Sequence, residues 1–150
     1  MKLAEALQER ADLNRKLDEL RTRLNNNVLV QEGETTAEDP AELLRQYDAA
    51  AQRLEELTAR INKTNCATED EGESVTDLIA RKDRLSMQVR TYRSAIEEAS
   101  QTARRAMRTE IKVLSAIDVR GLQKKTDALA AELRRLDNRI QALNWSTDLK

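Results

Sequence analysis

The chain has 150 residues, a net charge of −1, and 35% charged residues that divide almost evenly between acidic and basic side chains. This balance gives no electrostatic argument for nucleic acid or an anionic membrane as a partner. With 2% aromatic residues and no Phe, Leu, Ile, Val and Ala must fill the core, which suits the seams between long helices. We predict a single helical-bundle domain over residues 1–150.

The side-chain inventory argues against several kinds of catalytic and metal site. The sequence contains no histidine, the commonest general base and metal ligand, and one cysteine, Cys66. A single cysteine cannot form an intrachain disulfide. Neither a glycine-rich phosphate-binding loop nor a nucleophile motif is present in the sequence. We therefore expect no enzyme activity, no metal and no cofactor.

Hydropathy predicts a soluble, cytoplasmic protein without membrane association. The N-terminal residues MKLAEALQERADL are charged from Glu5 onward and lack the continuous apolar segment of a signal peptide. The mean hydropathy is −0.73, and apolar runs stay far below the ~20 residues of a membrane-spanning helix.

The first predicted helix covers residues 2–25. Its apolar side chains alternate at spacings of three and four residues, which places them on one helical face. They are Leu3, Ala6, Leu13, Leu17, Leu20 and Leu24. Arg10 interrupts this face, and we weigh two interpretations: a side chain that reaches out to water, or an ion pair that sets register or holds an interface. Three consecutive asparagines, Asn25 to Asn27, are expected to end the helix.

Residues 28–31 are predicted to be extended and to lead into a turn at Gly33. The second helix begins with Asp39 as its N-cap and Pro40 in its first position, and runs to about Lys63. The same alternating spacing recurs along it. Its apolar positions are Leu43, Tyr47, Ala50, Leu54, Leu57 and Ile61.

The third helix is predicted to begin after Ser74 and to reach Arg108, either bent near residues 99–105 or with a projecting end. Residues 109–117 break the helical period, and Ile111 and Val113 alternate with polar residues as in a half-buried strand. A fourth helix, capped by Asp118, should run to about Asn144. Its repeat comprises Leu122, Thr126, Leu129, Leu133, Leu136, Ile140 and Leu143.

Short connections between four long helices favour an all-α antiparallel four-helix bundle. In that topology the first and third connections lie at the same end, so we predict that residues 28–31 pair with residues 111–114 as a small two-stranded sheet. The opposite end should gather the N-terminus with residues 62–66 and 144–145.

The unpaired sheet edge and the end of the third helix are expected subunit contacts in a homo-oligomer. The candidate interface residues are Val28, Val30, Ala103, Met107, Ile111 and Val113. A weaker candidate for binding a small ligand is the polar cluster at the opposite end of the bundle. Its members are Asn62, Lys63, Asn65, Asn144 and Trp145. The asparagines could instead cap the last carbonyls of their helices, and Trp145 could cover the bundle end.

Four segments, in this order along the chain, resemble motifs of an uncharacterised bacterial helical-bundle family, a domain of unknown function whose members are often named septicolysin. They are Asn25-Asn26-Asn27 through Val30-Gln31-Glu32-Gly33, Ile61-Asn62-Lys63-Thr64-Asn65, Thr109-Glu110-Ile111-Lys112 and Leu143-Asn144-Trp145. The resemblance implies a helical protein without an established activity and offers no catalytic residues to carry over. The family name implies a pore-forming cytolysin.

We therefore predict a non-enzymatic, self-associating structural or interaction protein. Two alternatives from other classes remain open at this point. One is a membrane-active cytolysin, as the family name implies, and the other is a small-ligand binder at the asparagine-rich end.

Overall fold

Long helices dominate the computed structural model, which describes residues 1–101 and 111–150. The elements are α1 (Leu3–Asn27), α2 (Pro40–Ala67), β1 (Glu69–Asp70), β2 (Glu73–Ser74), α3 (Val75–Ala99) and α5 (Val119–Ser146). Four long helices, a small two-stranded sheet and helix packing of the helical-bundle kind confirm the predicted fold class. The chain divides into two compact units, which we name unit 1 (residues 1–69 and 143–150) and unit 2 (residues 70–142).

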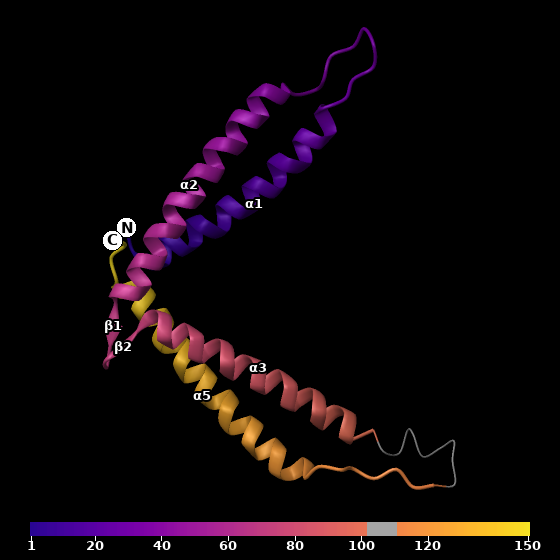
Figure 1. Ribbon diagram of the computed structural model, residues 1–150, viewed down its shortest axis with the longest axis vertical. Coiled ribbons are helices and arrows are strands. Elements are labelled where there is room, and N and C mark those ends of the chain that lie inside the picture. Colours follow the sequence, from indigo (N-terminus) through magenta and orange to yellow (C-terminus); the bar gives the residue numbers. More distant parts are fainter. Residues whose placement is uncertain (102–110) are drawn as a thin grey trace. The chain divides into compact units, whose positions relative to one another are not determined.

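In unit 1, α1 and α2 lie side by side and run in opposite directions (Figure 1). Their contact is built from the predicted repeat. The buried apolar cluster comprises Leu3, Ala6, Leu57, Ile61 and Leu149, and Leu7 and Leu13 pack against it. Leu20 on α1 and Leu43 and Ala50 on α2 are buried at other positions of the repeat, so the seam continues along both helices.

Residues 147–150 pack against the start of α1 within unit 1. The Leu3 N–H donates to the Thr147 carbonyl, and the Leu149 N–H donates to the Met1 carbonyl, both at 2.9 Å. Lys2 Nζ lies 2.9 Å from Asp148 Oδ1, and this ammonium group lowers the pKa of Asp148. These contacts place the N-terminus beside the residues that directly follow the predicted pair 144–145.

In unit 2, α3 and α5 lie side by side (Figure 1). The buried apolar side chains come from both helices and repeat at helical spacing. They are Val75, Leu78, Leu85 and Val89 on α3 and Ala130, Leu136 and Ile140 on α5. An ion pair between Lys82 and Asp137 and the ammonium of Lys125 over the Tyr92 ring, 5.0 Å from its centroid, join the two helices further.

The small sheet lies at β1 and β2, so the predicted pairing of residues 28–31 with residues 111–114 is wrong. The turn of the hairpin explains its position. Glu71 and Gly72 have positive φ angles of 52° and 81°, as both central residues of a type I′ hairpin turn require. Residues 28–31 and 111–114 are irregular and exposed.

The helix starts follow the predicted caps. The Asp39 carboxylate accepts from the Ala41 N–H at 3.0 Å, and the Asp118 carboxylate accepts from the Gly121 N–H at 3.0 Å. Ser74 and Asp77 form a reciprocal capping box. The predicted end of the third helix is wrong, because α3 ends at Ala99. The remainder of that prediction, residues 102–108, lies outside the described residues.

Among residues 1–101 and 111–150, none of the helices combines the length and the apolar character that a membrane span needs. The prediction of one domain over the whole chain stays a prediction.

Candidate functional site

The asparagine-rich end places its five predicted ligand-binding residues on the last turns of α2 and α5. Asn62 and Lys63 are exposed on α2, and Asn65 is half-buried. On α5, Asn144 is buried, whereas Trp145 is 63% exposed. All five belong to unit 1. Their exposure thus ranges from 6% at Asn144 to 63% at Trp145, and the ligand-binding assignment stays a prediction.

Sequence reasoning missed the residues that fix this end of unit 1. Thr64, fully buried, donates from Oγ1 to the Arg60 carbonyl at 2.8 Å and accepts from the Lys150 N–H at 3.0 Å. Arg60 Nε donates to the Lys150 carbonyl at 2.9 Å. These contacts hold the segment after Trp145 against α2. The sequence signal for these contacts was Thr64 itself, a threonine at a position where the repeat places an apolar residue.

The connection between α1 and α2 exposes three consecutive aliphatic side chains, Val28, Leu29 and Val30, with Leu29 88% exposed. We name these three residues the first tip. The Glu34 N–H donates to the Gln31 carbonyl at 3.0 Å, which closes the predicted turn, and Gly33 adopts a φ of 85° there. Two predicted interface residues therefore lie at the surface.

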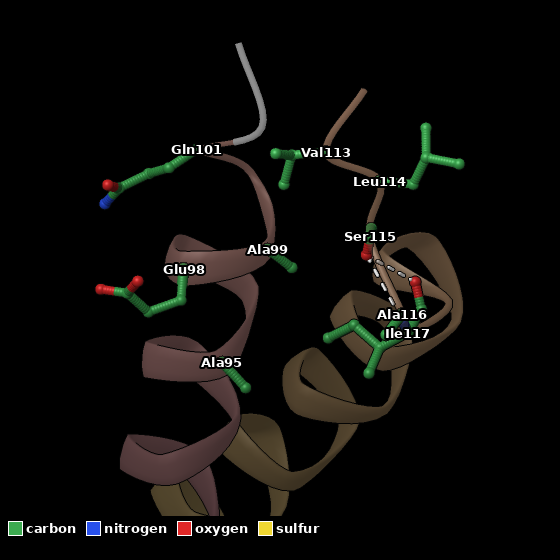
Figure 2. A pocket seen from close by; sticks show the side chains of 9 residues that line it. All are labelled: Ala95, Glu98, Ala99, Gln101, Val113, Leu114, Ser115, Ala116 and Ile117. Atoms are coloured by element: carbon green, nitrogen blue, oxygen red, sulfur yellow. Dashed lines mark hydrogen bonds between the residues drawn. The ribbon is translucent and has the colours of Figure 1, made fainter. Parts of the chain in front are cut away.

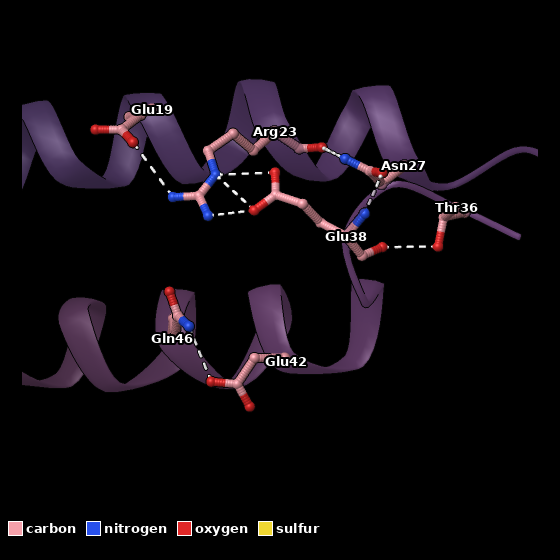
Figure 3. Close-up of polar contacts among 7 residues, drawn as sticks. All are labelled: Glu19, Arg23, Asn27, Thr36, Glu38, Glu42 and Gln46. Carbon is pink, nitrogen blue, oxygen red and sulfur yellow. Dashed lines mark hydrogen bonds and ion pairs between the residues drawn. The ribbon is translucent and has the colours of Figure 1, made fainter.

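Polar contacts close the base of this connection (Figure 3). The buried Asn27 side chain donates to the Arg23 carbonyl and accepts from the Glu38 N–H, both at 2.9 Å. The Arg23 guanidinium binds both carboxylate oxygens of Glu38. This ion pair lowers the pKa of Glu38 and raises that of Arg23. Thr36 Oγ1 donates to the Glu38 carbonyl at 2.7 Å.

The connection that leads into α5 exposes Ile111, Leu114 and Ile117, and Val113 is exposed to a smaller extent. We name residues 111–117 the second tip. A groove of about 380 Å³ lies between this segment and the end of α3. Figure 2 shows Ala95 and Ala99 on one wall of the groove and residues 113–117 on the other. Two other predicted interface residues, Ala103 and Met107, lie outside the described residues.

A second groove, of about 620 Å³, follows α2 on unit 1. Leu17 of α1 lines it together with side chains of α2. These include Tyr47, Ala51, Leu54, Thr58 and, at one end, Asn62. Sequence reasoning assigned Tyr47 and Leu54 to the seam with α1, but both are only half-buried. The signal it missed is a second alternating repeat on α2, which begins at Leu44.

An arginine of α5 binds the carboxylates of the hairpin. Among residues 1–101 and 111–150, no three His, Cys, Asp or Glu side chains are grouped so that they could hold a metal ion. Arg139 lies among Asp70, Glu71 and Glu73, and its guanidinium also donates to the Asp70 carbonyl at 2.8 Å. The hydrogen bond to Asp70 raises the pKa of Arg139. Arg139 thus offsets part of the negative charge of the hairpin.

Comparison with solved structures relates the whole chain to one of unknown function. The match is the crystal structure of a functionally unknown conserved protein from Corynebacterium diphtheriae, with 38% sequence identity and a TM-score of 0.96. The alignment covers 100% of this chain and 99% of that chain. A comparison with curated proteins gave no match.

A family model matches residues 10–149, and its description is a family of unknown function, DUF6847. Neither this description nor that of the solved structure carries the name septicolysin. The sequence resemblance is thus confirmed for a family of unknown function and not for the cytolysin that its name implies. The chain belongs to the DUF6847 family of unknown function.

Proposed function

We propose that the chain is a non-enzymatic protein that works by binding copies of itself. The observation that carries this proposal is the exposure of large aliphatic side chains in both connections between paired helices. Leu29 lies in the first tip, and Ile111 and Leu114 lie in the second. Exposed apolar side chains that gather in one place mark interaction sites.

The first tip supports the proposal because its base is fixed before any partner binds. Asn27 bonds to the backbone at both ends of the connection, and Arg23 donates hydrogen bonds to both carboxylate oxygens of Glu38. A fixed base reduces the conformational entropy that the connection loses on binding. More of the free energy gained by burying the apolar side chains then contributes to binding affinity.

The second tip supports the proposal through the groove beside it. Ala95 and Ala99 present small apolar side chains on the α3 wall, and Ile117 lies on the opposite wall. An aliphatic side chain from another copy would leave water on entering this groove, with a gain of about 0.8 kcal/mol per buried CH₂ group. Small wall residues leave room for such a side chain.

The other predictions from the sequence gain no specific support from the described residues. They are a membrane-active cytolysin, a small-ligand binder at the asparagine-rich end, and a location in the cytoplasm. The absence of enzyme activity likewise stays an expectation from the residue inventory.

The test is the solution mass of the full chain, measured by light scattering over about a hundredfold range of concentration. We expect a multiple of 17.1 kDa. Leu29→Asp should lower this mass, because a charge in the first tip opposes its desolvation. The matched control is Met87→Asp, at a Met that is 54% exposed on α3 outside both tips.

A mass of 17.1 kDa at every concentration would contradict self-association. An oligomer that survives Leu29→Asp would contradict the use of the first tip.

A further inference from the structure

Helix α2 carries two adjacent apolar stripes. One stripe is buried against α1 and includes Leu43, Ala50 and Leu57. The second stripe comprises Leu44, Tyr47, Ala51, Leu54 and Thr58. Its spacing of three, four, three and four residues is the repeat that packs one helix against another. None of these five side chains is fully buried, and Leu44 is 47% exposed.

The second stripe and Leu17 of α1 form one surface, which we name the α2 face. Leu17 and four members of the stripe line the 620 Å³ groove along unit 1, and Leu44 continues the stripe by one turn. An alternating apolar repeat usually packs against another helix, but this one lies at the surface. A second helix of matching pattern would bury it.

We propose that the α2 face binds the α2 face of a second copy, with the two α2 helices antiparallel about a two-fold axis beside residues 52 and 53. The proposal relies on the self-association proposed above but assigns it to a different surface. Two copies joined in this way would bring together four helices, two from each unit 1.

Side-chain sizes along the stripe favour this register. A two-fold axis between residues 52 and 53 sets Ala51 opposite the partner's Leu54 and Tyr47 opposite the partner's Thr58. In both of these layers a large side chain then meets a small one, which lets them interdigitate without voids. A two-fold interface applies this match twice, because both copies present the same surface.

Charges around the face also fit a second copy. Asp48 and Glu55 follow Tyr47 and Leu54 along α2, and Glu55 lines the groove. Arg10 lies seven residues before Leu17, two turns away on the same side of α1.

Among the described residues, Arg10, Asp48 and Glu55 form no ion pair. A surface that binds its own copy needs both signs of charge at its edge, since a surface of one sign repels itself. The α2 face has an apolar centre, a tyrosine and a charged border, which is the usual composition of an interface.

The first test substitutes the centre of the face in the full chain. Leu54→Glu places a charge opposite the partner's Ala51 and should raise the dimer dissociation constant about tenfold or more, measured by sedimentation equilibrium. Met87→Glu is the matched control and should leave the constant unchanged. Circular dichroism and thermal unfolding show whether each variant keeps its helices.

A charge exchange separates a lost contact from a damaged fold. Arg10→Glu alone should weaken the dimer, and so should the pair Asp48→Arg and Glu55→Arg. All three substitutions together should restore much of the association, because opposite charges then face each other again. Failure to restore it would overturn the assignment of these charges to the interface.

The variants also separate this proposal from the use of the first tip. A dimer lost in Leu54→Glu and kept in Leu29→Asp supports the α2 face and overturns the role of the first tip. A dimer lost in Leu29→Asp and kept in Leu54→Glu overturns the α2 face alone. A monomer at every concentration overturns both proposals.

Discussion

The two units share one apolar repeat, but different polar contacts close their ends. In unit 1, Asn27, Arg23 and Glu38 tie the end of α1 to the start of α2. In unit 2, Arg139 on α5 binds the carboxylate and the carbonyl of Asp70 in the hairpin that precedes α3. The repeat therefore supplies the seam of each pair, and single polar side chains fix how each pair is closed.

This division predicts that the largest losses of stability come from the seams. Leu57 in unit 1 and Leu85 in unit 2 are fully buried. Leu57→Ala and Leu85→Ala should each lower the free energy of unfolding by about 2–5 kcal/mol, because each leaves a cavity. Denaturant titration followed by circular dichroism measures the change.

Leu133 supplies the control for both seams. Its side chain is on the same repeat but only half-buried, so Leu133→Ala should cost less than either substitution. Equal losses at all three positions would contradict the burial pattern on which the comparison depends.

The polar contacts of Asn27, Arg23 and Glu38, which we name the clamp of unit 1, should contribute less to the free energy of unfolding than the seam between α1 and α2. Asn27→Ala removes the acceptor of the Glu38 N–H and the donor to the Arg23 carbonyl. We expect the free energy of unfolding to fall by about 1–3 kcal/mol, because these backbone groups lose their partner. Asn26→Ala, at an exposed neighbour, should have a much smaller effect, and a similar loss at both positions would argue against the clamp.

Periodicity made the helices predictable, since caps and repeats both depend on neighbouring residues. Asp39, Ser74 and Asp118 cap their helices as predicted. The strands were misplaced because alternation in residues 28–31 and 111–114 says nothing about a pairing partner. The turn at Glu71 and Gly72 was missed because glutamate is an uncommon residue at a positive φ.

The candidate sites were predictable only as exposed positions. Val28, Val30 and Ile111 are at the surface, as interface residues must be. The clamp and the bonds of Thr64 join residues distant in sequence, such as Thr64 and Lys150. A local sequence pattern does not predict such a pair, because the contact depends on how the helices pack.

Thr64 tests whether polar contacts also close the other end of unit 1. Thr64→Val keeps the shape but removes the acceptor of the Lys150 N–H. We expect the free energy of unfolding to fall by about 1 kcal/mol and hydrogen exchange at the Lys150 amide to accelerate. Thr22→Val is the control, since Thr22 Oγ1 donates to the Asp18 carbonyl of its own helix, and faster exchange of the Lys150 amide in both variants would contradict the contact.

The smallest expected effect concerns acid, and it distinguishes the two units by mechanism. The pKa of Glu38 in unit 1 is lowered chiefly by its hydrogen bonds with Arg23, and that of Asp77 in unit 2 chiefly by hydrogen bonds from Ser74. A carboxyl group whose pKa is lower in the folded state stabilises the fold above its unfolded pKa. This contribution is lost as the pH falls through the folded pKa.

The losses should therefore begin below about pH 4.5 for Glu38 and below about pH 3.8 for Asp77, the ordinary pKa values of these two carboxyl groups. Glu38→Gln and Asp77→Asn should each flatten the acid limb of a plot of thermal midpoint against pH. Added salt should weaken the Glu38 contribution, because salt screens an exposed ion pair, and should affect Asp77 less, because its partner is a neutral hydroxyl and a backbone N–H. If salt reduces the contributions of Glu38 and Asp77 equally, then charge, rather than the capping geometry of Ser74, governs the ionisation of both groups.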